Sequence, residues 1–193
     1  MPKALNIIRD EHRSIAAVLH GMQHLVRQIG ERKTKIDPKV LRAMLYYLDT
    51  FTERMHHPKE DRFLFRPLRR RGPGPDALIA ELERDHAEGS ASLRRVEQCL
   101  IRYEEGGDKE FPEFAREVHR FVNGYWDHMR KEEEHVFPLA EKLLSAADWT
   151  AIDRAFGENA DPLERSRDEK DFRKLFSRIV SLAPPPIGVG PAT

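Results

Sequence analysis

A histidine and a glutamate four residues apart occur twice in this sequence, each time in a stretch predicted to be helical. The first pair, His56 and Glu60, lies in TERMHHPKEDRFLFRPL, and the second, His128 and Glu132, lies in YWDHMRKEEEHVFPLAEKLL. Because an α-helix has 3.6 residues per turn, this spacing places the imidazole and the carboxylate on one face. One such pair arises easily by chance in a charged helix. Its recurrence 72 residues later indicates an internal duplication.

An apolar stripe with helical spacing precedes each pair, and one histidine interrupts each stripe at the same place. His12 interrupts the first stripe, and His86 interrupts the second one 74 residues later. The other members of the two stripes are Leu5, Ile8, Ile15, Leu19, Met22, Val26 and Ile29, and then Ile79, Leu82, Gly89, Leu93, Val96, Leu100 and Tyr103. Steps of three and four residues mark one face of a helix. The chain is therefore predicted to be two copies of a two-helix unit.

Helix signals place four long helices at about 3–29, 38–70, 76–106 and 110–144. Asp37 before Pro38, and Asp76 after a Gly/Pro-rich break, are expected to cap the second and third helices. Pro58 lies between His56 and Glu60 and is expected to distort the helix locally without ending it, since the apolar pattern resumes at Phe63. Short connections favour an all-α, up-down-up-down antiparallel four-helix bundle.

The C-terminal part lies outside the duplication. Asp148 is expected to cap a short helix reaching Phe156, and a capping box at Ser166–Glu169 predicts a second short helix carrying Phe172, Leu175, Phe176 and Ile179. The tail is rich in Pro and Gly and should be extended or disordered. The predicted organisation is a bundle over 1–145, a helical appendage over 146–183 and a tail over 184–193.

Composition narrows the function classes. About a third of the 193 residues are charged and the formal net charge is zero, so neither nucleic acid nor an acidic membrane is an expected partner. The single cysteine, Cys99, rules out a disulfide framework and a thiolate-rich metal site, and its place predicts a buried thiol. With no membrane span and no secretory leader apparent, we expect a soluble, cytoplasmic protein, and the sequence identifies no protein partner.

In an antiparallel bundle, the histidines and the two pairs would converge on the bundle axis. Bare carboxylates in a helical core cost several kcal/mol unless a cation or proton compensates. We therefore predict a metal site formed by His12, His56, Glu60, His86, His128 and Glu132. Two glutamates at equivalent positions suggest carboxylates that bridge two metals about 3.5–4 Å apart. The ligand types suit iron, and manganese or zinc remain open alternatives.

Single histidines on the first and third helices, with H-x-x-x-E on the second and fourth, resemble the hemerythrin-like (HHE cation-binding) family of non-haem di-iron proteins. The resemblance covers about residues 5–140, and HHPKEDRFLF and HMRKEEEHVFP are similar to the two ligand helices of that family. It implies that the six residues above bind two irons, with Glu60 and Glu132 bridging. The ligand set also resembles the di-iron domain of the repair-of-iron-centres proteins.

The chain differs from these two groups of proteins at two points, and both bear on the expected function. The oxygen-carrying hemerythrins have a further histidine where this chain has Ser90, which speaks against simple oxygen carriage, and the cysteine-bearing domain of the repair proteins does not precede the bundle. The expected function is binding or sensing of a small molecule (O2, NO or peroxide) or iron handling. Two alternatives stay open: an oxidoreductase that consumes peroxide or NO, and a redox- or metal-responsive interaction module that works through the segment after Asp148.

Five further histidines are interpreted as non-ligands. His57 forms a second i,i+4 pair with Asp61, but it is turned about 100° from His56 and its counterpart in the second copy is Met129. The remaining four are His20, His24, His119 and His135, whose counterparts are not histidines. Tyr125, one turn before His128, is equally compatible with a donor to a bound molecule and with an ordinary core residue.

Overall fold

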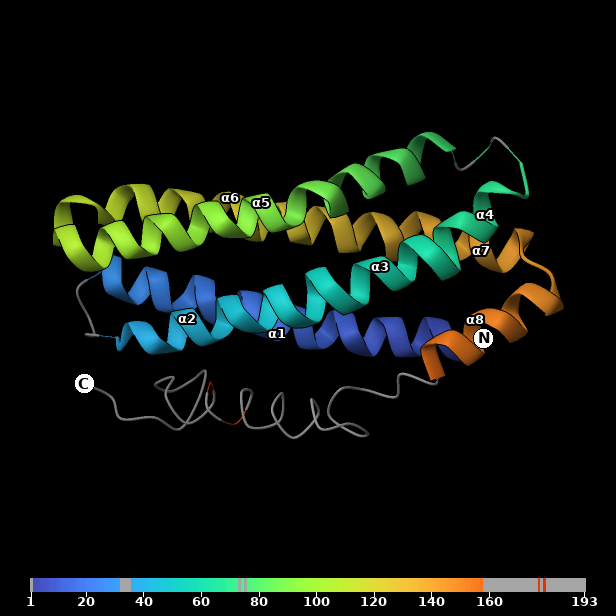
Figure 1. Ribbon diagram of the computed structural model, residues 1–193, viewed down its shortest axis with the longest axis horizontal. Helices are drawn as coiled ribbons and strands as arrows, with labels where there is room; N and C mark the ends of the chain where they lie inside the picture. Colours follow the sequence, from blue (N-terminus) through green and yellow to red (C-terminus); the bar gives the residue numbers. More distant parts are fainter. Residues whose placement is uncertain are drawn as a thin grey trace.

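The computed structural model describes residues 2–31, 36–72, 74, 76–157, 177 and 179. All regular structure in these residues is helical. Four long helical stretches lie side by side, and a short helix lies close to the N-terminus at one end (Figure 1). The predicted all-helical fold is thus confirmed. Among the described residues, none of the helices combines the length and the apolarity that crossing a membrane requires.

The first and third stretches are uninterrupted α-helices, α1 (Lys3–Gly30) and α5 (Asp76–Gly106). Their predicted stripes face the interior, since both sets are buried except for Ile29 and Tyr103, which are partly buried. α1 ends at Gly30, where the next residue donates its backbone N–H to Arg27 O. Asp76 was expected to cap α5 and is instead the first helical residue, a difference of one position in where the helix begins.

The second stretch alternates between α-helical and π-helical turns. It consists of α2 (Pro38–Tyr47), η1 (Leu48–His56), α3 (His57–Lys59), η2 (Glu60–Phe65) and α4 (Arg66–Arg69). As predicted, Asp37 caps it, accepting a hydrogen bond from Lys39 N at 2.9 Å. The distortion expected at Pro58 is present, and the helix continues beyond it to Arg69.

The fourth stretch follows the short 3₁₀ turn η3 (Gly107–Lys109) and has the same kind of interruption. It consists of α6 (Phe111–Lys131), the π-helical η4 (Glu132–Val136) and α7 (Phe137–Leu143). η1, η2 and η4 are each followed by a proline at the second position of the next helix, namely Pro58, Pro67 and Pro138. A proline has no N–H and its ring displaces the carbonyl four residues before it. A wider turn accommodates that displacement, and π turns of this kind are frequent at functional sites.

The long stretches contact one another in a ring: α1 packs on α2 and α6, and α5 packs on the same two helices. Within this ring the core is divided into two apolar clusters. The larger contains Leu19, Met22, Met44, Leu48, Val96, Cys99, Phe114 and Val122, and the smaller contains Leu5, Ile8, Leu64, Phe65, Leu82, Phe137 and Phe156. Cys99 is a buried free thiol, as predicted. Burial of each large side chain contributes about 1.5–3 kcal/mol.

The short helix α8 (Ala146–Gly157) begins two residues before the predicted Asp148. Ser145 is its cap: Ser145 Oγ accepts from Asp148 N at 3.3 Å, and Asp148 Oδ2 accepts from Ser145 N at 2.8 Å. This reciprocal arrangement is a capping box, so Asp148 occupies the third helical position and does not cap the helix itself. Phe156 and Ile152 of α8 are buried in the smaller apolar cluster.

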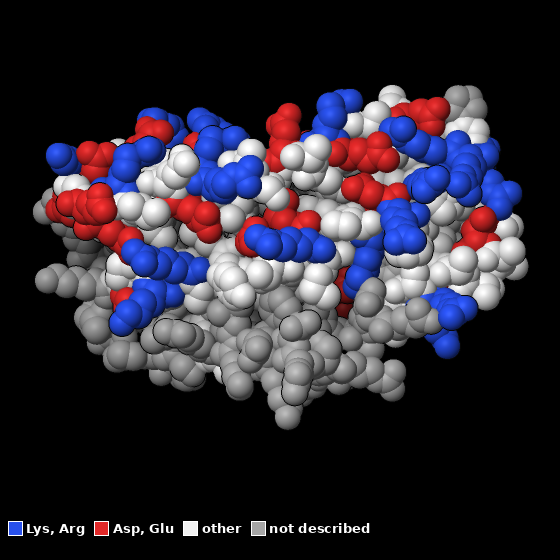
Figure 2. All heavy atoms as spheres, in the orientation of Figure 1, with Lys and Arg blue, Asp and Glu red and all other residues white. Residues whose placement is uncertain are grey.

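The predicted helix from Ser166 and the tail over 184–193 lie outside the described residues, apart from Ser177 and Ile179. Ile179 is buried in the larger apolar cluster. The division into 1–145, 146–183 and 184–193 stays a prediction. On the face that Figure 2 shows, Lys and Arg are mixed with Asp and Glu, which agrees with the balanced charge of the chain.

Candidate metal centre

The six residues predicted from the repeat meet in one polar layer between the two apolar clusters. They are His12 on α1, His56 at the end of η1, Glu60 at the start of η2, His86 on α5, His128 on α6 and Glu132 at the start of η4. All six are buried, and both glutamates are 0% exposed. The duplication therefore converges on one place inside the bundle.

Each of the two glutamates faces imidazoles from both halves of the chain. Glu132 Oε2 lies 3.2 Å from His12 Nε2, and Glu132 Oε1 lies 3.4 Å from His128 Nε2. Glu60 Oε1 lies 3.7 Å from His12 Nε2, and Glu60 Oε2 lies 3.4 Å from His56 Nε2 and 3.7 Å from His86 Nε2. The two oxygens of each carboxylate thus face different imidazoles.

The carboxylate oxygens of Glu60 and Glu132 have no hydrogen-bond donor among the described residues. His12 Nε2 likewise has no hydrogen-bond partner there. An unpaired charge in a protein interior costs several kcal/mol. The same atoms form compact groups that suit a cation. His12, His56 and Glu60 offer ligand atoms within 4.8 Å of one another, and so do Glu60, His86, His128 and Glu132. Buried imidazoles and carboxylates in such groups fit one or two metal ions.

The outward-facing nitrogen of each of these four imidazoles contacts a second carboxylate. The pairs are His12 Nδ1 with Glu133 Oε1 at 2.8 Å, His56 Nδ1 with Glu11 Oε2 at 2.7 Å, His86 Nδ1 with Asp61 Oδ1 at 2.7 Å and His128 Nδ1 with Asp85 Oδ2 at 3.3 Å. A carboxylate that accepts from Nδ1–H fixes the ring and leaves Nε2 as the free lone pair, which is the usual support of a metal-binding histidine.

Sequence reasoning missed these four supporting acids, although the repeat contains a signal for them. Glu11 and Asp85 immediately precede the histidines of α1 and α5, and Asp61 and Glu133 immediately follow the two glutamates of the pairs. Asp61 was interpreted only as an i,i+4 partner of His57. Its actual partner, His86, lies on another helix, so spacing along one helix could not reveal the contact.

The charges in this layer shift the pKa values of its groups. Burial lowers the pKa of His128, but the charge of Glu132 and the hydrogen bond to Asp85 outweigh it and raise that pKa to about 10. Burial also lowers the pKa of His12, and its contacts with Glu132, Glu133 and Glu60 raise it well above 6.5 overall. In the absence of a metal, protons on these imidazoles would therefore balance the buried carboxylates.

His57 was set aside as a non-ligand, yet it is buried beside the centre. Its ring is stacked on that of His86, with centroids 4.0 Å apart and planes 13° apart. His57, His86 and His128 form a further close group of possible ligands. An imidazole binds a metal in the plane of its ring, and two parallel stacked rings cannot both do so with one ion. In this arrangement His57 is a neighbour of the centre, and its assignment as a non-ligand stays a prediction.

Tyr125 is buried, and its hydroxyl donates a hydrogen bond to Glu53 Oε1. Ser90 Oγ donates to the other oxygen of Glu53 at 3.5 Å. Gly89 makes room for this carboxylate, since a Cβ at position 89 would lie 2.2 Å from Glu53 Oε2. Ser90, at the position where the oxygen-carrying hemerythrins have a further histidine, thus contacts the buried pair Glu53 and Tyr125. Sequence reasoning did not anticipate this cluster.

The other four histidines lie away from the centre. His20, His119 and His135 are exposed, and His24 is partly buried, with its Nδ1 3.2 Å from Arg27 Nη2. Sequence reasoning had excluded these four from the ligand set on the basis of the repeat, and their positions agree with that.

The family model of the hemerythrin HHE cation-binding domain matches residues 3–140, which is most of the chain. Neither the curated proteins nor the solved structures gave a match. The matched segment contains all six residues of the polar layer and the four supporting acids. The chain belongs to the hemerythrin HHE cation-binding domain family.

Proposed function

We propose that this protein binds two metal ions, preferentially iron, and uses them to bind or sense a small molecule such as O2, NO or peroxide. The ligands would be His12, His56, Glu60, His86, His128 and Glu132, held in an up-down-up-down four-helix bundle. The supporting observation is the pair of fully buried carboxylates, Glu60 and Glu132, whose four oxygens have no hydrogen-bond donor in the described part of the chain. A cation supplies the missing compensation, and two carboxylates facing both halves suit bridging between two ions.

The residues around the centre would define its chemistry. Bound iron would supply a redox-active position that small molecules can reach. Glu11, Asp61, Asp85 and Glu133 would hold the four imidazoles in one tautomer and increase their basicity. The rings of Phe65 and Phe137 stack on those of His86 and His12, with centroids 5.5 and 6.1 Å apart. Both side chains are 0% exposed and would keep bulk water out.

The test is metal analysis of protein prepared without oxygen, together with absorption spectra before and after exposure to O2. We expect about two metal ions per chain, as in other carboxylate-rich bundle sites, and new near-ultraviolet bands after exposure. Glu132→Ala should remove most of the metal. Glu117→Ala is the matched control, because Glu117 is likewise buried but contacts Arg95 and Arg120 instead of histidines. Equal metal content in both variants would refute the proposed centre.

One observation favours turnover of peroxide or NO as a second candidate. Burial raises the pKa of Glu53, partly opposed by the hydrogen bond from Tyr125, and burial together with the charge of Glu53 raises the pKa of Tyr125 well above 10. Both groups can therefore hold a proton close to the centre, which reduction of peroxide requires. If the protein is such an enzyme, Tyr125→Phe should slow peroxide consumption without changing metal content. An iron-loaded protein that consumes neither peroxide nor NO would leave binding or sensing as the function.

A further inference from the structure

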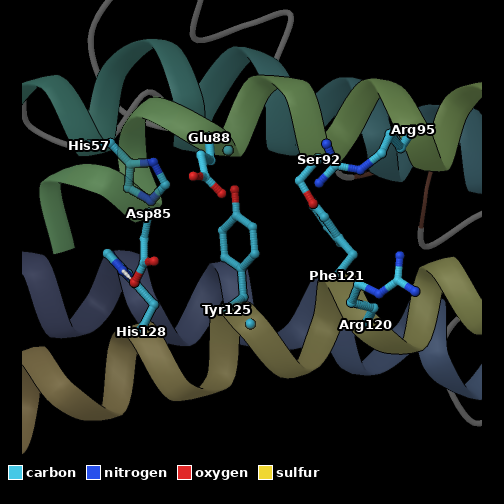
Figure 3. A pocket seen from close by; sticks show the side chains of 11 residues that line it. His57, Asp85, Glu88, Ser92, Arg95, Arg120, Phe121, Tyr125 and His128 are labelled. Atoms are coloured by element: carbon cyan, nitrogen blue, oxygen red, sulfur yellow. Dashed lines mark hydrogen bonds and ion pairs between the residues drawn. The ribbon is translucent and has the colours of Figure 1, made fainter. Parts of the chain in front are cut away.

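A cavity of about 200 Å³ lies between α5 and α6 and ends at the candidate metal centre. His57 and His128 lie together at one end, which we call the inner end, Tyr125 lies next to them, and Asp85 and Glu88 line the cavity on the side of α5. Figure 3 shows these side chains arranged around the hollow, with Arg95 and Arg120 farther along it. The cavity thus joins exposed side chains to an imidazole of the centre.

A buried nitrogen without a partner stands at the inner end. His57 is 5% exposed, and its Nδ1 has no hydrogen-bond partner among the described residues. The nearest acidic atom, Glu53 Oε1, lies 3.6 Å away. Glu53 Oε1 also accepts from the Tyr125 hydroxyl, so only the His57 nitrogen is unpaired. An unpaired buried imidazole nitrogen close to a buried carboxylate offers two ligand atoms of the kind that a divalent cation binds.

The charges along the cavity favour a cation over an anion. Asp85 and Glu88 are exposed at its wall. The two arginines are neutralised in part, because Arg95 Nε and Arg120 Nη1 contact the carboxylate of Glu117 at 3.3 and 2.5 Å. Acidic groups that line a narrow path attract cations and increase their rate of association.

A glycine keeps the α6 wall of the cavity open. Gly124 lies inside α6, where glycine is less favourable than alanine. A Cβ at this position would meet no atom within 4 Å, so packing does not require glycine here. What the missing side chain preserves is the open space of the cavity.

We infer that this cavity is the path by which divalent metal ions enter the centre, and that Glu53 and His57 bind the ion transiently on the way. The inference rests on the proposed metal centre. Ligand nitrogens of His57, His86 and His128 lie within 4.8 Å of one another, so the ion would move only a short distance from His57 to its final ligands. The stacking of His57 on His86 prevents both rings from holding the ion together, so the site is one of transfer.

A second cavity reaches the opposite side of the centre, between α1 and α6. It is lined by His12 and Glu133, which already contact each other, and by two arginines, Arg13 and Arg130. Among its lining residues, the unpaired buried nitrogen is His12 Nε2, and this atom faces the centre. The second cavity therefore has no counterpart of His57, which lies outside the six predicted ligands. This cavity provides a control for the proposed path.

The test is the rate at which the metal-free full-length protein takes up Co²⁺ without oxygen, followed by stopped-flow absorption. The blocking variant is Ser92→Leu with Gly124→Leu, which fills the cavity from both helices, and its matched control is the double alanine variant at the same positions. Ala16→Leu narrows the second cavity. His57→Gln removes the transfer ligand, and Glu88→Gln removes one acidic charge.

We expect the double leucine variant and His57→Gln to take up Co²⁺ at least about tenfold more slowly, which corresponds to about 1.4 kcal/mol in the barrier. Glu88→Gln should slow uptake a few-fold, and added salt should diminish that effect. The final amount of bound Co²⁺ should equal that of the wild type in every case. The double alanine variant and Ala16→Leu should show wild-type rates.

Two outcomes separate this inference from the proposed function. If the wild type binds no Co²⁺ at equilibrium, the metal centre itself is wrong and the path fails with it. If loading is normal but the double leucine variant keeps the wild-type rate, the centre stands and the path is refuted. A reduced final amount of Co²⁺ in His57→Gln would also overturn the inference, because His57 would then be a permanent ligand.

Discussion

The contact between Glu11 and His56 allows a direct test of the ring of supporting acids. Glu11 Oε2 lies 2.7 Å from His56 Nδ1, and both side chains are buried. Replacing Glu11 with Gln keeps an acceptor of the same size but removes the charge, whereas replacing it with Ala removes the acceptor as well. If His56 binds a metal through Nε2, each change should weaken metal binding in proportion to the support that is lost.

The magnitude follows from the role of such acids. Loss of a supporting partner typically weakens metal binding 10–100-fold. We expect about tenfold for Glu11→Gln and about a hundredfold for Glu11→Ala, which correspond to about 1.4 and 2.7 kcal/mol. The upper value should apply to Ala, because this contact is short and shielded from water, so that solvent cannot replace the lost carboxylate.

The assay is competition for Co²⁺ or Zn²⁺ between the protein and a chelator of known affinity at fixed pH. Glu117→Gln serves as the control, since it changes a buried carboxylate that contacts no histidine of the centre. Unchanged affinity in Glu11→Ala would show that the outer carboxylates do not support metal binding. Complete loss of one metal in Glu11→Gln would show that Glu11 binds the metal directly.

Three further predictions concern stability. The pKa of His128 is about 10 in the folded protein against 6.5 when unfolded. Burial raises the pKa of Glu132, but the charges of His128 and His12 outweigh it and bring that pKa well below 4.5. The metal-free protein should therefore be most stable between pH 4.5 and 6.5, and urea unfolding should show stability falling as pH rises from 6.5 towards 10 and as it falls below 4.5. A flat profile would contradict the pairing. Gly89→Ala should lower the free energy of unfolding by about 1 kcal/mol, because displacing the Glu53 carboxylate costs more stability than the alanine gains in helix propensity. A rise in the unfolding midpoint would refute this. Ser145→Ala should cost about 1 kcal/mol in thermal unfolding through loss of the α8 cap, and an unchanged melting temperature would show that the cap contributes little.

Much of the fold was accessible from periodicity. The stripes containing His12 and His86 identified the inward faces of α1 and α5, because burial of apolar side chains at three- and four-residue steps is a property of any packed helix. Pro58 predicted a local distortion of the helix in the second stretch. The sequence did not indicate that three segments would be π-helical, since the width of a turn depends on how its carbonyls and neighbouring helices adjust around each proline.

The candidate site could be predicted only as far as local spacing and duplication reach. These place His56 with Glu60 and His128 with Glu132 on one face, and the structure brings both pairs together with His12 and His86. That these six bind metal stays a prediction. Spacing along one helix was misleading for Asp61, whose hydrogen bond goes to His86 across the bundle.

By itself, the sequence determined which residues face inward and which positions repeat, because both follow from the 3.6-residue period that every helix obeys. Only the tertiary structure decided which acid supports which histidine, where Glu53 and Tyr125 lie, and that His57 stands beside the centre at the end of a cavity. These contacts join residues of different helices, and they depend on the axial offset and rotation of one helix against another. That packing is set by the whole core, and no stretch of the chain encodes it locally.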